Sequence, residues 1–127
     1  MGECKKILII DKDETALINL SMFFAENDFY VIYANNVTEG IQKALTEKPC
    51  LIILGMSGKS NIIVTRKLQI NKNIKRIPII MIGDVPLFKK HFGLNEQFPM
   101  LKNYIIKPIN RELLFKKVNE LLNHKFR

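Results

Sequence analysis

Charged residues and glycines follow short apolar runs at four places in the sequence. Asp11, Lys12 and Asp13 come directly after the run KILII at residues 6–10. Asp11 and Asp13 supply carboxylate oxygens, the hard ligands that divalent cations prefer, so this place could attract such an ion weakly. The other three places are poorer in acids: Gly55 follows LIIL, Gly83 and Asp84 follow IIMI, and Lys107 and Pro108 follow YII.

The apolar runs that precede these residues are predicted to be strands. They are short, uniformly apolar and rich in β-branched residues, as is typical of parallel strands buried on both faces. Strands are expected at residues 6–10, 29–34, 51–54, 79–82 and 104–106. Helices are expected at residues 14–26, 36–48, 62–70 and 86–92 and from residue 110 onward. This alternation predicts a doubly wound α/β fold, whose functional site lies at the carboxyl ends of the strands.

Each helix has a predicted buried face and, in two cases, a predicted first residue. Asn36 and Asn110 are expected to cap the helices that follow them. The apolar residues expected to point into the core are Leu17, Leu20, Met22, Phe23 and Phe24 in the first helix, Ile41, Ala44 and Leu45 in the second, and Leu113, Leu114, Val118, Leu121 and Leu122 in the last.

The length and composition indicate one globular domain over residues 1–127. Of the 127 residues, 47% are hydrophobic, enough for a single core. No apolar run reaches the ~18–20 residues of a membrane span, and no segment resembles a signal peptide. Cys4 and Cys50 are too few for a disulfide framework, so we expect two reduced thiols in a cytoplasmic protein.

Charge is distributed unevenly along the chain. The net charge is +8, but residues 1–60 carry 6 lysines and 8 acids, whereas residues 61–127 carry 14 basic residues and 4 acids. The second half, at +10, could serve an acidic partner, and the alternative is a solvated basic face that only favours solubility.

The strand motifs resemble the receiver domain of bacterial two-component response regulators. The motifs KILIID, PCLIIL, IPIIM and YIIKP occur in the family's order and at nearly its spacing, over about residues 5–122. The resemblance implies a flavodoxin-like (βα)5 sandwich with a parallel five-stranded sheet of order 2-1-3-4-5. It also implies phosphotransfer chemistry, in which an aspartate after the third strand accepts a phosphoryl group beside Mg²⁺ held by two acids.

Only part of that chemistry is present in this sequence. By resemblance, Asp11 matches the first acid and Lys107, followed by Pro108, matches the family's phosphate-contacting lysine. Lys12 stands at the position of the second acid. Glycines stand at the two remaining positions: Gly55 at the phosphoacceptor and Gly83 at the threonine or serine after the fourth strand. Glycine has no carboxylate, so we expect a receiver fold without receiver phosphorylation, with weak or absent Mg²⁺ binding, no cofactor and no enzymatic activity.

Two arrangements of the altered pocket are open. In one, the Lys12 ammonium lies near the place of the missing Mg²⁺ and Lys107 pairs with Asp11. In the other, Lys12 extends into solvent. Asp13 is expected to turn away into the cap of the first helix, and Asp84 is expected to cap the helix after the fourth strand.

The resemblance implies that partners bind the fourth helix, fifth strand and fifth helix. Tyr104 matches the family's switch aromatic, and an exposed Phe88 or Phe115 beside lysines would form a docking or dimer face. The lysines concerned are Lys89, Lys90, Lys116 and Lys117. The expected partner is therefore an acidic protein or a second copy of the chain, and no membrane contact is expected. The domain could act alone or as part of a longer regulator.

Two other functions remain open from the sequence. The basic excess could serve a nucleic-acid-binding module, although no recognition motif accompanies it. A conventional receiver could instead accept a phosphoryl group at Ser57 or Asp13. The segment Gly58-Lys59-Ser60 lacks the upstream glycine of a phosphate-binding P-loop, and an anion in the turn at residues 55–60 is a minor alternative.

Overall fold

The computed structural model describes residues 4–55, 67, 68, 70–83 and 103–125, with side chains described as far as residue 122. Five parallel strands form one sheet of order β2-β1-β3-β4-β5. The strands are β1 (Lys6–Asp11), β2 (Tyr30–Ala34), β3 (Leu51–Gly55), β4 (Ile79–Gly83) and β5 (Tyr104–Ile106). The sequence-based prediction of the fold and its strand order is confirmed, with strand ends shifted by one residue.

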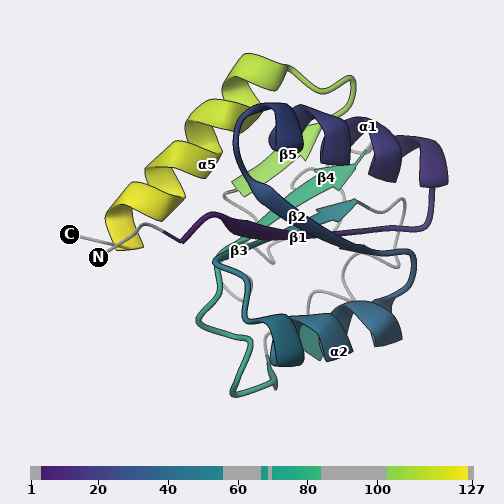
Figure 1. The fold of residues 1–127 in the computed structure, drawn as a ribbon, viewed down its shortest axis with the longest axis vertical. Coiled ribbons are helices and arrows are strands. Elements are labelled where there is room, and N and C mark those ends of the chain that lie inside the picture. Colours follow the sequence, from purple (N-terminus) through teal and green to yellow (C-terminus); the bar gives the residue numbers. More distant parts are fainter. Residues whose placement is uncertain (1–3, 56–66, 69, 84–102, 126–127) are drawn as a thin grey trace, which may run out of the picture.

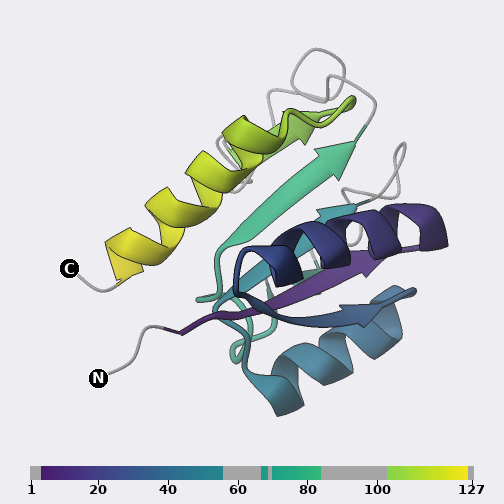
Figure 2. The ribbon, with the colours of Figure 1, turned by 45° about the horizontal axis from the view of Figure 1, so that its top comes forward.

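Helices cover both faces of this sheet. Helices α1 (Glu14–Glu26) and α5 (Arg111–Lys125) lie on one face, and α2 (Val37–Glu47) lies on the other (Figure 1). Figure 2 shows β2 at the edge of the sheet, between the levels of α1 and α2. Of the third predicted helix, the described residues 67, 68 and 70 are helical, and the fourth lies outside the described residues.

Alternate residues of the buried strands pack into two separate hydrophobic cores, one on each face of the sheet. Ile7, Ile9 and Ile53 pack with Leu17, Phe24 and Leu114 between the sheet and helices α1 and α5. Leu8, Ile10, Ile52 and Leu54 pack on the other face with Ala44, Leu68 and Ile74. Because side chains alternate along a strand, a central strand must be apolar at every position to fill both cores, which explains runs such as LIIL.

The predicted helix caps are present. The Asn36 side-chain oxygen accepts a hydrogen bond from the N–H of Glu39 at 2.8 Å, and the Asn110 oxygen accepts one from the N–H of Leu113 at 3.1 Å. These bonds satisfy N–H groups that have no partner in the first helical turn.

The helix faces differ from the prediction at a few apolar residues. Met22 is 57% exposed, Leu113 is 42% exposed and Leu45 is 37% exposed, so none of these three belongs to the core. Each helix has more apolar residues than the sheet can cover, and residues on the flank of the buried stripe point to solvent. By contrast, Leu17, Leu20 and Phe24 are buried as predicted.

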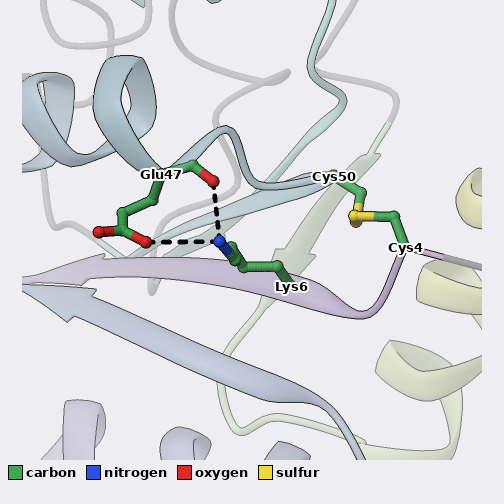
Figure 3. Close-up of a disulfide and its surroundings, with 4 residues drawn as sticks. All are labelled: Cys4, Lys6, Glu47 and Cys50. Atoms are coloured by element: carbon green, nitrogen blue, oxygen red, sulfur yellow. Dashed lines mark hydrogen bonds and ion pairs between the residues drawn. A yellow bond between two sulfur atoms is a disulfide. The ribbon is translucent and has the colours of Figure 1, made fainter.

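The expectation of two free thiols is wrong: Cys4 and Cys50 form a disulfide (Figure 3). The two residues are 46 positions apart in sequence, with Cα atoms 6.1 Å apart. Cys4 precedes β1 and Cys50 precedes β3, and these strands are neighbours with Ile7 opposite Leu51. Sheet register therefore brings together two cysteines whose sequence spacing gives no sign of pairing.

Candidate functional site

The carboxyl ends of β1 and β3 lie side by side and bring two of the predicted site residues together. In the register of these parallel strands, Asp11 is opposite Gly55. Asp11 is 6% exposed and is the one buried charged residue among those the structure describes. A buried carboxylate beside a glycine is thus the centre of the candidate site.

The Asp11 carboxyl group is held in place from the next loop. Its Oδ1 accepts a hydrogen bond from the N–H of Asp13 at 2.9 Å. Burial raises the pKa of Asp11 above its ordinary value, although this hydrogen bond and the positive charge of Lys107 act in the opposite direction. The nearby Asp13 charge adds to the increase in pKa.

Gly55 is tightly covered by this carboxyl group. A Cβ atom built on Gly55 would overlap Oδ2 of Asp11 and would lie 2.9 Å from its Cγ. Any side chain at position 55 therefore requires the Asp11 carboxyl group to shift or rotate. The absence of a side chain at Gly55 and the inward position of Asp11 depend on each other.

Asp13 has a structural role in this arrangement, as the sequence predicted. It is the N-cap of α1, and its Oδ1 accepts hydrogen bonds from the N–H groups of Thr15 at 2.9 Å and Ala16 at 3.4 Å. A carboxylate at this position also interacts favourably with the positive end of the helix dipole. Its Oδ1 is therefore engaged at the start of the helix.

The two lysines of the predicted pocket are both exposed. Lys12 is solvent-exposed, in agreement with the second of the two arrangements. Among the ion pairs of the described residues there is none between Asp11 and either lysine, so the predicted Asp11–Lys107 pair is not formed. An exposed lysine keeps its hydration, and Lys107 influences Asp11 only through space.

The ends of β4 and β5 complete the edge of the site. Gly83 is buried, and its carbonyl oxygen accepts a hydrogen bond from the N–H of Lys107 at 2.7 Å. The peptide bond between Lys107 and Pro108 is cis. Asp84 and Ser57 lie outside the described residues, so their predicted roles are not placed.

The site residues do not fit the Mg²⁺ ion that the resemblance implies. Mg²⁺ needs several oxygen ligands in nearly octahedral geometry. Gly55 offers no carboxylate, Asp13 is engaged at the helix cap, and no group of three or more His, Cys, Asp or Glu side chains within the described ranges could hold a metal ion.

The predicted partner face is only partly as expected. Phe115 is not an exposed docking residue: it packs against the first core, with ring centroids 6.1 Å from Phe23 and 6.4 Å from Phe29. Helix α5 lies against α1, and position 115 points into that contact. Tyr104 is half-buried against the second core, Lys116 is exposed and Lys117 is half-buried. Phe88, Lys89 and Lys90 lie outside the described residues.

A second surface was missed by the sequence reasoning. A groove of about 450 Å³ lies between α1 and β2, and its lining includes Ile18, Met22 and Tyr33, each more than half exposed. We call it the α1–β2 groove. Its signal in the sequence is a second apolar pair in α1, since Ile18 and Met22 are one helical turn apart and do not belong to the buried stripe.

Comparison with known proteins agrees with the fold and with part of the sequence pattern. No protein-family model matches the chain. It is 27% identical to the protein PilH of Pseudomonas aeruginosa strain PAO1 over 120 residues, which cover 92% of this chain and 97% of PilH.

Solved structures give the same result. A two-component response regulator from Clostridium difficile is 27% identical, with a TM-score of 0.74 over 94% of this chain and 96% of that one. A CheY-like receiver domain protein from Methanospirillum hungatei JF-1 has a TM-score of 0.76 at 22% identity, with 95% of each chain covered, and shows the shared fold. The strand order, the residues at the strand ends and these likenesses together support a response regulator receiver domain of the CheY-like type.

Proposed function

We propose that this chain is a receiver domain of bacterial signal transduction that acts without phosphorylation, through protein–protein contact and not as an enzyme. The observation that carries the proposal is the pair Asp11 and Gly55. The position that follows β3 has no carboxylate to accept a phosphoryl group, and the neighbouring carboxyl group fills the space above it. Phosphoryl transfer needs a nucleophile and fixed positive charge around the phosphate, and this pocket lacks the nucleophile.

The direct test is intact-mass spectrometry after incubation with acetyl phosphate and Mg²⁺. We expect no added phosphoryl group on the wild-type chain. A stable phosphoryl adduct would contradict the proposal and favour the alternative of a non-standard acceptor. Treatment with hydroxylamine then separates the two candidates, because it cleaves an acyl phosphate on Asp13 and leaves a phosphoserine at Ser57 intact. The variants Asp13→Asn and Ser57→Ala would assign the site.

A variant that restores the missing carboxylate tests whether the position of Asp11 blocks the pocket. Gly55→Asp introduces the missing carboxylate, but its Cβ overlaps Asp11 Oδ2. We expect Gly55→Asp to lose stability and to remain unphosphorylated, because the Asp11 carboxyl group must shift and a second carboxylate then lies beside it. Gly83→Ala, at the end of the neighbouring strand, is the control for adding a methyl group at a strand end. Efficient phosphorylation of Gly55→Asp would show that the Asp11 position does not block the pocket.

The proposed partner surface includes β5 and α5, and the fourth predicted helix, which the resemblance adds to this surface, lies outside the described residues. Lys116, Lys107 and Arg111 are exposed there, and the chain is strongly basic after residue 60. This supports an acidic protein partner or a second copy of the chain. The double variant Lys116→Glu/Lys117→Glu should weaken recovery of a partner in a pull-down, whereas Lys12→Glu/Lys48→Glu, in the first half of the chain, should not. Unchanged recovery after reversal at positions 116 and 117 would leave this face without a role.

A nucleic-acid-binding module is the second candidate, because the same basic excess would favour phosphate contacts. Fluorescence anisotropy with duplex DNA at two salt concentrations tests it. Binding that persists at ~100 mM salt and weakens steeply above that would favour nucleic acid over protein as the partner.

The proposed location is the cytoplasm, and the disulfide gives a way to test it. None of the helices in the described ranges is long and apolar enough to cross a bilayer. Because a reducing cytoplasm keeps most thiols free, the Cys4–Cys50 disulfide of this structure argues against that location. Rapid alkylation of thiols in intact cells, followed by mass spectrometry, would report the state of the pair. A disulfide that persists in intact cells would contradict the cytoplasmic proposal.

A further inference from the structure

The α1–β2 groove has the composition of a docking surface. Its apolar part is formed by Leu17, Ile18 and Met22 of α1 and by Tyr33 of β2. Ile18, Met22 and Tyr33 are 58%, 57% and 56% exposed, so three large side chains of one groove lie mostly in water. Isolated exposed apolar residues are common, but a contiguous group around a concave surface indicates a binding site.

The groove is not suited to adding a strand to the sheet. β2 is the edge strand, and edge strands can bind an extended peptide through free carbonyl and N–H groups. Here the Lys43 Nζ donates a hydrogen bond to the carbonyl oxygen of Tyr33 at 2.7 Å and lies 5.5 Å from the centre of the Tyr33 ring. Lys43 belongs to α2, and its ammonium group occupies a carbonyl oxygen of this strand. A partner must therefore bind by its side chains.

A helix is the partner shape that the groove accepts. Ile18 and Met22 are four residues apart on α1, so they form a stripe about 6 Å long that runs along the helix. Apolar residues spaced by three and four positions on a partner helix can pack against such a stripe.

The charges of the groove favour a basic partner. Glu14 and Glu39 contribute carboxylates to its lining, and Lys43, the one cation among the described lining residues, is paired with Glu39 at 3.5 Å. Within the described residues Glu14 has no ion pair. The groove is thus a locally acidic place in the half of the sequence with a net charge of −2, on a protein of +8. A symmetric contact between two copies would instead place these carboxylates against their equivalents.

We propose that the α1–β2 groove binds a basic amphipathic helix of a partner protein, with the partner's apolar residues on Ile18, Met22 and Tyr33 and its lysines or arginines beside Glu14 and Glu39. The groove lies at the β2 edge of the sheet, and β5 lies at the opposite edge, so the domain can contact two partners of opposite charge.

A model peptide tests the proposal. It contains leucine at helical spacing, lysine elsewhere and one tryptophan, whose fluorescence is selective because the chain has no tryptophan. An otherwise identical peptide with glutamate in place of lysine is the control for charge. We expect the basic peptide to bind the wild-type chain and Ile18→Lys/Met22→Lys to weaken its binding by about tenfold or more.

The matched control variant is Ile106→Lys/Leu113→Lys, where an isoleucine and a leucine are 40% and 42% exposed. It adds the same charge, and we expect it to change the peptide affinity less than about twofold. Glu14→Lys should weaken binding by about threefold to tenfold, whereas Glu26→Lys, at the far end of α1, should not. Circular dichroism shows whether each variant is folded.

A measurement on the wild-type chain keeps the test independent of the variants. With methionine methyl groups labelled for NMR, saturation with the basic peptide should shift the Met22 signal. The proposal would be overturned by an unmoved Met22 signal or by an equal loss of peptide affinity in both double variants. Tighter binding of the acidic peptide to the groove would overturn it as well. So would a dimer that becomes monomeric in Ile18→Lys/Met22→Lys, because the groove would then hold a second copy.

Discussion

The two edges of the sheet differ in charge and in how their apolar residues are used. At the β2 edge, three large side chains line a groove with two carboxylates, and they remain more than half exposed. At the β5 edge, helix α5 turns Phe115 inward to an aromatic cluster and presents Lys116 and Arg111 outward. Because the strand order is 2-1-3-4-5, β2 of the acidic half and β5 of the basic half stand at opposite edges of the sheet. This arrangement lets one small domain offer two chemically distinct surfaces.

The largest expected effect concerns the disulfide, which lies within the first half of the chain. Reduction of Cys4–Cys50 should lower the free energy of unfolding by about 4 kcal/mol, because it releases a loop with a sequence separation of 46 in the unfolded chain. Urea titration with and without a reducing agent measures this difference. The variant Cys4→Ser should resemble the reduced chain and show no response to the reducing agent. Equal stability of both forms would mean that the bond does not constrain the fold.

The aromatic cluster between α1 and α5 should contribute nearly as much to the free energy of unfolding as the disulfide does. Phe115→Ala removes ring contacts with Phe23 and Phe29 and should cost ~3 kcal/mol of stability. Leu113→Ala, two positions away and 42% exposed, should change stability by less than ~0.5 kcal/mol. The comparison is made by chemical denaturation. Similar costs at the two positions would contradict the inward orientation of Phe115.

A smaller effect is expected from the cap of α1. Asp13→Ala leaves the N–H groups of Thr15 and Ala16 without their acceptor and should cost ~1 kcal/mol. Asp13→Asn, which keeps a side-chain oxygen, should retain most of the stability. If instead both variants lost the same amount, the carboxylate charge and not the hydrogen bond would be responsible.

The smallest expected change in stability concerns Asp11, and here the substitution is expected to stabilise the fold. Since burial raises the pKa of Asp11 in the folded chain, the folded state binds a proton more tightly than the unfolded state. The stabilising contribution of the protonated group is complete below the unfolded pKa and is lost as the pH rises through the folded pKa. At neutral pH, Asp11→Asn should therefore be slightly more stable than the wild type. Its advantage should shrink as the pH falls through the raised pKa of folded Asp11 to the ordinary aspartate range, and it should change no further below that range. A destabilised Asp11→Asn would show that the charge itself is needed at this edge.

Local pattern was enough to predict the elements and part of the site. Apolar runs specified the strands, the alternation specified the parallel sheet, and Asn36, Asn110 and Asp13 were identified as residues near helix starts. These predictions succeed because capping and burial depend on residues only a few positions apart. The glycine at position 55 is likewise evident without coordinates.

The tertiary structure decided which distant residues meet. Strand register joined Cys4 to Cys50, and it placed the Asp11 carboxyl group directly over Gly55. Helix packing turned Phe115 inward and left Met22 exposed. The sequence by itself determined the strands, the caps and the unequal charge of the two halves, because these depend on residue type and local spacing. Pairing, burial on a helix flank and the α1–β2 groove depend on the register and packing angles of segments far apart in the chain, which only the assembled fold defines.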